Sequence, residues 1–180
     1  MSGSQQAHEL AFRATALCGA SAGYVALFLL LVGGGATVTR AAGANTPADD
    51  EKDIRAVLDA QVVAWNKGDL DGFMAGYWND EKLTFISGGD ITAGWKKTKE
   101  RYVKRYQADG KEMGKLTFGE LYLETFGADA AMLRGKFELT FEKETDAKKK
   151  TARGRFTLIL KKLPDGWKIV HDHTSAEEMK

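Results

Sequence analysis

The sequence predicts an α+β domain in which three helices precede a sheet of four long, mainly antiparallel strands. Apolar residues first recur at helical spacing, from Ile54 to Trp65 and again from Trp95 to Tyr106. Four long segments rich in β-branched and aromatic residues follow, separated by short polar or glycine-containing connections. Only two prolines occur in 180 residues, which argues against a fibrous or disordered chain. This order of elements is typical of an α+β architecture.

The helical segments have recognisable ends. The first stripe of apolar residues stops at Gly68, and Asp69 then caps a short second helix. A short strand at 83–86 leads into the turn Ser-Gly-Gly-Asp at 87–90. Gly94 precedes the third helix, whose lysines and arginines we interpret as a solvated face.

The last two predicted strands form a hairpin. The four strands are Leu116–Phe126, Ala130–Glu144, Thr151–Leu163 and Trp167–Ser175. Pro-Asp-Gly at 164–166 suits a three-residue hairpin loop. Because side chains alternate between the faces of a strand, the hairpin predicts one face that is apolar near the turn and polar near the C-terminus. The members of this face are Arg155, Thr157, Ile159, Trp167, Ile169, His171, His173 and Ser175.

The opposite face of the hairpin is apolar as well. It carries Phe156, Leu158, Leu160 and Val170. A sheet with two apolar faces needs two covers, and the helices can cover only one of them. We therefore expect the outer face to pair with a second copy of the chain in a homodimer.

The N-terminal segment has the pattern of a secretory signal peptide. Arg13 precedes a stretch from Ala14 to Thr39 without a charged residue, and Ala-Gly-Ala at 42–44 supplies a cleavage pattern. An uncleaved membrane anchor is the alternative, since the uncharged stretch is long enough to cross a bilayer. We expect export to the periplasm or the exterior. The expected organisation is a signal peptide at 1–44, a linker at 45–53 and the folded domain at 54–180.

Removal of the signal peptide narrows the available chemistry. The remaining chain has equal numbers of acidic and basic residues, so no overall charge favours nucleic acid or an anionic membrane. The single cysteine, Cys18, is lost, which excludes disulfides and cysteine nucleophiles. Of the histidines, His171 and His173 remain, and a metal site would need a further carboxylate. We expect no metal and no cofactor.

Several segments of the mature domain carry recognisable motifs. They are WNKGDLDGF at Trp65–Phe73, Tyr77, Gly94-Trp95, RFTL at Arg155–Leu158 and DGWKIVHDHTS at Asp165–Ser175. From about Asp50 to its end, the chain resembles the SnoaL-like, ketosteroid-isomerase-homologue family of the nuclear-transport-factor-2-like superfamily. This resemblance implies a cystatin-like cone: three N-terminal helices packed in a strongly curved, mixed or antiparallel sheet, with a pocket at the open end. It also implies a dimer through the outer sheet face.

The resemblance does not imply one activity, because the fold hosts isomerases, dehydratases, cyclases, epoxide hydrolases and binding modules. Ketosteroid isomerases use a tyrosine on the first helix, an aspartate base after the first strand and a second acid on a late strand. The first two positions fall on Gln61 and near Ser87, and no acid occurs in 155–160. Asp90 remains an alternative base. We expect no steroid isomerisation.

We expect instead a pocket that binds a small, partly apolar or acidic molecule without turnover. One alternative is a divergent cyclase, hydrolase or dehydratase that uses His173 or His171 as acid and base. Another is a non-catalytic dimerisation module. The predicted ligand-binding residues are Tyr77, Ser87, Trp95, Tyr102, Arg155, Thr157, His171 and His173.

Overall fold

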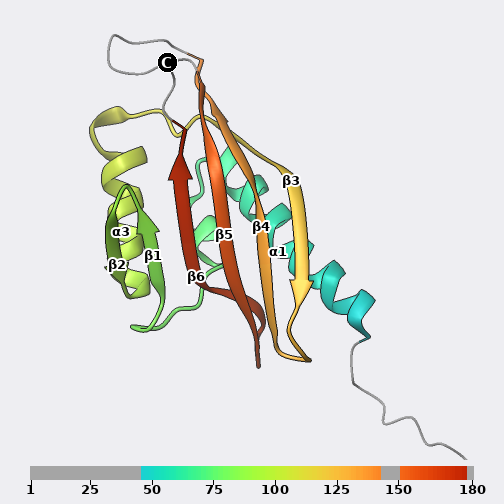
Figure 1. The fold of residues 1–180 in the computed structure, drawn as a ribbon. Coiled ribbons are helices and arrows are strands. Elements are labelled where there is room, and N and C mark those ends of the chain that lie inside the picture. The colour runs from blue at the N-terminus through green and yellow to red at the C-terminus, as the bar shows by residue number, and fades with distance from the viewer. Residues whose placement is uncertain (1–45, 143–150, 178–180) are drawn as a thin grey trace, which may run out of the picture. The chain divides into compact units, whose positions relative to one another are not determined.

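The computed structural model describes residues 46–142 and 151–177. The helices are α1 (Pro47–Asn66), α2 (Leu70–Met74) and α3 (Trp95–Tyr106), followed by a 3-10 turn, η1 (Ala108–Gly110). The strands are β1 (Thr84–Ser87), β2 (Asp90–Ala93), β3 (Lys115–Thr125), β4 (Ala130–Thr140), β5 (Thr151–Leu163) and β6 (Gly166–Ala176) (Figure 1). The predicted signal peptide lies outside the described residues. Among the described residues, no helix has the length and apolar content needed to cross a membrane.

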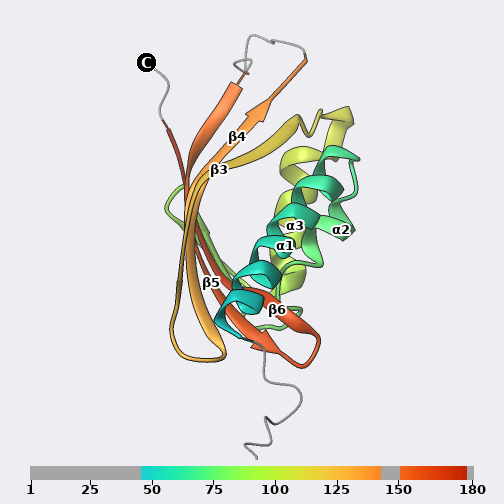
Figure 2. The same cartoon turned by 90° about the vertical axis from the view of Figure 1, so that its right-hand side faces the viewer.

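The described strands form one mixed sheet in the order β2-β1-β6-β5-β4-β3. Neighbouring strands are antiparallel except β1 and β6, which run parallel. Figure 2 shows the sheet as a single curved layer with all three helices on its concave side. The predicted α+β class with a curved, mixed sheet is confirmed. The sequence did not indicate β2, which pairs with β1 across the turn at Gly88 and Gly89.

The first helix begins earlier than predicted. Thr46 caps it in a reciprocal arrangement: its hydroxyl accepts from the backbone N–H of Asp49, whose carboxylate accepts from the backbone N–H of Thr46. The prediction of a linker over 45–53 is therefore wrong for residues 47–53, which are helical. Charged residues fill these first two turns, so they show no apolar period and give no hydrophobic signal of a helix.

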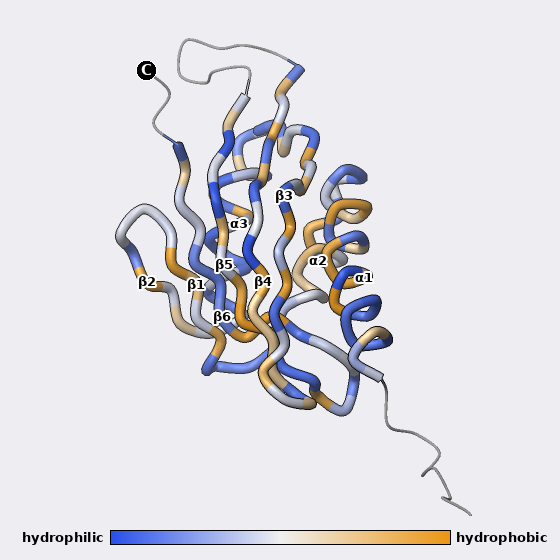
Figure 3. Tube along the Cα trace, turned by 45° about the vertical axis from the view of Figure 1, so that its right-hand side comes forward, coloured by the Kyte–Doolittle hydropathy of each residue, from blue (hydrophilic) through white to orange (hydrophobic). Residues whose placement is uncertain are grey.

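The core lies between the helices and the concave face of the sheet. Ile54 and Leu58 of α1 pack in one cluster with Leu133 of β4, Leu158 of β5 and Ile169 of β6. In Figure 3, hydrophobic and hydrophilic residues alternate along α1 and along the strands, as expected for elements with one buried side.

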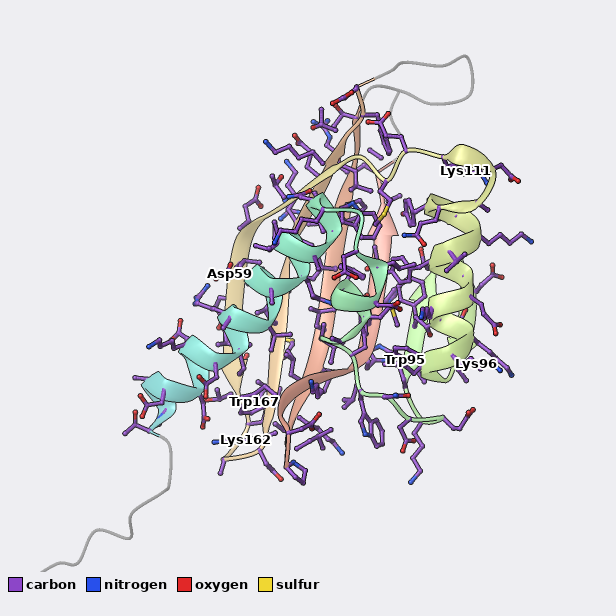
Figure 4. All side chains as sticks on the ribbon, turned by 180° about the vertical axis from the view of Figure 1, so that it is seen from behind. Asp59, Trp95, Lys96, Lys111, Lys162 and Trp167 are labelled. Carbon is purple, nitrogen blue, oxygen red and sulfur yellow. The ribbon has the colours of Figure 1, made fainter. Side chains whose placement is uncertain are left out.

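A buried carboxylate fixes α1 to the β5–β6 hairpin. Asp50 accepts hydrogen bonds from Nζ of Lys162 at 2.6 Å and from Nε1 of Trp167 at 3.2 Å. Lys162 and Trp167 lie together at the end of the sheet beside the first half of α1 (Figure 4). A charge buried in this way is tolerated because both donors satisfy it.

The β5–β6 hairpin contains a bulge that strict alternation did not predict. Ile159 pairs with His171 as expected, but Leu160 pairs with Ile169, so Val170 is an extra residue on β6. At the turn, Leu163 pairs with Gly166, and the loop is therefore one residue shorter than predicted. One extra residue reverses the inward and outward positions beyond it.

The predicted composition of the two hairpin faces is consequently wrong. Trp167 and Ile169 point into the core, but beyond the bulge Asp172 is the buried residue. The side chains of Arg155, Thr157, His171, His173 and Ser175 lie on the convex, outer face, where each is exposed or only half-buried.

The outer face is also less apolar than predicted. Phe156, Leu158 and Leu160, which were assigned to it, are buried under the helices. An ion pair between Arg155 and Glu120 stands on the outer face instead. The described part of the hairpin therefore lacks the second apolar face from which the homodimer was predicted, and the homodimer stays a prediction.

Candidate functional site

A cavity of about 100 Å³ lies between the helices and the sheet. Its wall is largely aromatic and comes from every layer of the fold: Trp65, Phe73, Phe85, Phe118, Phe137 and Phe156. Polar groups are fewer and come from α1, α3, β1, β6 and the segment after α2. An apolar cavity with a few convergent polar groups is typical of a small-molecule site.

Asp172 of β6 is the acidic side chain of the cavity lining, and it is only 3% exposed. Its Oδ2 accepts a hydrogen bond from the hydroxyl of Tyr77 at 2.7 Å, and its Oδ1 accepts one from the hydroxyl of Thr174 at 2.7 Å. The hydroxyl of Tyr102 lies 3.4 Å from that of Tyr77. We call Asp172, Tyr77 and Tyr102 the acid–tyrosine cluster.

The backbone explains how the cluster is assembled. The segment after α2 is fixed to β6 at the start of the bulge, where Ile169 donates to the carbonyl of Gly76 and Trp78 donates to the carbonyl of Ile169. Tyr77 therefore lies beside β6, within reach of Asp172. On the other side, Tyr102 of α3 packs against Phe85 and other aromatic rings, which hold its hydroxyl toward Tyr77.

Burial controls the protonation of the cluster. It raises the pKa of Asp172 to about 6, outweighing the hydrogen bonds from Thr174 and Tyr77, which favour the charged form. Burial, and then the nearby charge of Asp172, raise the pKa of Tyr77 and of Tyr102 well above the ordinary tyrosine range. Both tyrosines therefore remain neutral donors near pH 7, while Asp172 changes charge within one to two pH units of neutrality.

Three of the residues predicted from sequence line this cavity: Tyr77, Ser87 and Tyr102. Trp95, also predicted to line it, has a different position. Its indole Nε1 donates to the carbonyl of Met74 at 3.0 Å and so joins the start of α3 to the end of α2. In Figure 4, Trp95 lies at the opposite end of α3 from Lys111.

The other four predicted residues are not brought to the cavity. Arg155 and Thr157 lie on the outer face with His173, and Nδ1 of His171 lies 2.6 Å from the hydroxyl of Thr84 on the neighbouring strand. Burial and the neighbouring His173 lower the pKa of His171. The prediction that these residues line the pocket assumed that they share the inward face with Trp167 and Ile169. The bulge at Val170 instead places His171 and His173 on the outer face, where they pair with Ile159 and Thr157 of β5.

Sequence reasoning missed Asp172, and it missed two arginines of α3, Arg101 and Arg105, that also line the cavity. A signal for Asp172 was present. Asp172 lies two residues after Val170, on the strand face that was assigned with Phe156 and Leu158. A carboxyl on an apolar face is unusual enough to mark a site.

Comparison with solved structures shows the same fold in other bacterial proteins. A nuclear-transport-factor-2-like protein of unknown function from Shewanella oneidensis MR-1 is 38% identical, with a TM-score of 0.62. The match covers 72% of this chain and 99% of that one. A ketosteroid isomerase-like protein from Erwinia carotovora atroseptica is 21% identical (TM-score 0.58; 71% of this chain, 96% of that one).

A cystatin-like fold protein from Burkholderia xenovorans LB400 is likewise 21% identical, with a TM-score of 0.55, over 74% of this chain and 96% of that one. No protein of curated function matches the chain. A family model for the SnoaL-like domain matches residues 54–177, which include every helix and strand described above except the first two turns of α1. The chain therefore belongs to the SnoaL-like domain family.

Proposed function

We propose that the cavity binds a small, largely apolar molecule and holds its polar group on the acid–tyrosine cluster. The observation that carries this proposal is the position of Asp172. A carboxyl that is buried for structure alone is normally enclosed by its partners. Asp172 has two donors on its oxygens and still lines free space, where it offers a polar contact within an aromatic wall.

The cluster suits a hydroxyl or carbonyl oxygen on the ligand. Tyr77 donates to Asp172, so its oxygen is free to accept from Tyr102, and at 3.4 Å that contact is long. The hydroxyl of Tyr102 can turn toward a ligand oxygen with little loss. The carboxylate of Asp172 can accept from a ligand hydroxyl, and its protonated form can donate to a ligand carbonyl.

Matched probes test this proposal. p-Cresol and toluene differ only by the hydroxyl group, and both fit a single-ring cavity. We expect p-cresol to bind about tenfold more tightly than toluene by calorimetry, because it gains a charge-assisted hydrogen bond. Asp172→Asn should reduce this preference, while Arg155→Gln on the outer face should not. Equal affinity of the two probes for the wild-type protein would contradict the proposal.

A second candidate is acid–base catalysis by Asp172, in place of the histidines considered from sequence. The buried carboxyl with its pKa of about 6 favours it, since such a group can take up and release a proton near neutral pH. Exchange of the α-protons of cyclohexanone in D₂O, followed by proton NMR, tests this candidate. Faster exchange with the wild type than with Asp172→Asn would support catalysis. Equal rates would leave binding alone.

Export and dimerisation also remain proposals, and both rest on the sequence and the family resemblance. Mass spectrometry of the protein from a periplasmic fraction tests cleavage after Ala44, and an intact chain in the membrane fraction would favour the anchor. Light scattering of the purified domain tests the homodimer. A monomer at high micromolar concentration would contradict it.

A further inference from the structure

We infer that the ligand of this cavity is a small organic carboxylate, held at its acidic end by Arg105 and Arg101 and at its other end by the acid–tyrosine cluster. This inference rests on the proposed function, because it uses the same cavity. It adds the chemical class of the ligand and its orientation.

Both arginines belong to the cavity lining. They are four residues apart on α3, so their side chains lie on one helix face about one turn apart. Tyr102 of the cluster lies on the same part of the helix. One element therefore contributes both the cationic groups and a hydroxyl of the cluster.

Arg101 is fixed in place by its surroundings. Its guanidinium donates to the carbonyl of Ser87 at 2.8 Å and to the hydroxyl of Thr92 at 3.3 Å, and it lies over the ring of Phe85. Its ionic partner, the exposed carboxylate of Asp90, is 3.6 Å away. Arg101 is thus a positioned cation at the β1–β2 side of the cavity, and its charge is only partly compensated.

Arg105 is the less engaged of the two. Its guanidinium lies over the ring of Tyr106, 5.5 Å from the centroid, and its side chain is exposed. Within the described residues it forms no ion pair. Arg105 also makes a side-chain hydrogen bond to Tyr106, but a guanidinium has five N–H donors in a planar fork, and the remaining donors match the two oxygens of a carboxylate.

The charges of the lining favour an anion over a neutral or cationic ligand. Two guanidinium groups and one deeply buried carboxyl line the cavity, and the carboxyl already has two donors. Because the wall between them is aromatic, the body of the ligand must be apolar. A cavity of about 100 Å³ suits one ring or a short branched chain rather than a fused ring system.

Three related probes test the inference: 4-hydroxyphenylacetate, its neutral amide, and p-cresol. We expect the acid to bind at least tenfold more tightly than the amide by calorimetry, and this preference to weaken at high salt because Arg105 is exposed. Arg105→Gln should reduce the preference severalfold, because Arg101 remains as the second cation at the acidic end, and it should weaken binding of the acid more than binding of the amide. The matched control is Lys104→Gln, which removes a neighbouring positive charge on α3 that does not line the cavity.

The outcomes separate this inference from the proposed function. If the acid and the amide bind equally, or if the preference is as large in Arg105→Gln as in the wild type, the carboxylate assignment is overturned. Binding of p-cresol that depends on Asp172 would then leave the proposed function standing. If none of the three probes binds at millimolar concentration, both proposals are contradicted.

Discussion

The hydroxyl of Tyr77 donates to Oδ2 of Asp172 across 2.7 Å, joining the segment after α2 to β6 within the cavity wall. The segment after α2 supplies the donor of this hydrogen bond and β6 supplies the acceptor, so the bond forms only when the two elements pack together. It holds a carboxyl in an apolar cavity and gives that carboxyl a pKa of about 6. The consequences can be measured.

Removing the tyrosine donor should destabilise the charged carboxyl. In Tyr77→Phe, Asp172 keeps the hydrogen bond from Thr174 but loses one donor. We expect its pKa to rise further and the free energy of unfolding at pH 7 to fall by about 1–2 kcal/mol. Carbon NMR of the Asp172 carboxyl and urea denaturation measure the two effects. An unchanged pKa would show that this hydrogen bond does not stabilise the carboxylate.

The contribution of Asp172 to stability should depend on pH with a definite sign. Its pKa rises from 3.8 to about 6 on folding, so the folded state favours the protonated form. Its contribution is therefore fully present below about pH 4 and is lost as the pH rises through 6, by about 3 kcal/mol at most.

Asp172→Asn removes the ionisable group at this position, so comparison with the wild type isolates the contribution of Asp172 ionisation to stability. We expect the stability of the wild type relative to Asp172→Asn to decrease between pH 4 and pH 7 in urea denaturation. A relative stability that stays constant or increases over this range would mean that burial does not control this carboxyl.

His173→Ala should change little. The imidazole lies on the outer face, away from the cavity lining. We expect the affinity for p-cresol to be unchanged and the free energy of unfolding to stay within about 0.5 kcal/mol of wild type. Calorimetry and urea denaturation provide the test. A tenfold loss of affinity would place His173 at the site and contradict the observed course of β6.

Gly154 of β5 should tolerate no side chain. A Cβ there would lie 2.8 Å from the Cα of Ala176 and 2.8 Å from the ring of Phe137, and closer still to the backbone carbonyl of Ser175. We expect Gly154→Ala to cost several kcal/mol, because backbone atoms of β6 would have to move. Gly119→Ala in β3 is the matched control, since nothing lies within 4 Å of its Cβ. Similar melting temperatures for the two variants would contradict this expectation.

The sequence predicted the helices and long strands because their signals are local. Apolar spacing located the body of α1, and Asp69 caps α2 as expected, with its side chain accepting from Gly72. The start of α1 was missed because the evidence for it is a cap at Thr46 and not an apolar period. Short β2 has an exposed Ile91 and no alternation to mark it.

The site was predicted only in part for a different reason. Tyr77 and Tyr102 were found through the family resemblance and helical spacing, which do not depend on strand register. The predictions on β6 failed together, because all of them assumed an unbroken alternation from the turn. No residue type in this part of β6 signals the bulge at Val170, which depends on pairing with β5 and on the segment that carries Gly76.

Because of the bulge at Val170, the number of residues in β6, and not only their identity, decides which side chains face the interior. In His171-Asp172-His173, the chain carries an acid and two imidazoles in alternation, and the irregularity selects the acid for the interior. Deleting or inserting a single residue at this point would exchange them without altering any of the three. In this chain, the length of one strand therefore decides whether the cavity has an acidic or a basic interior.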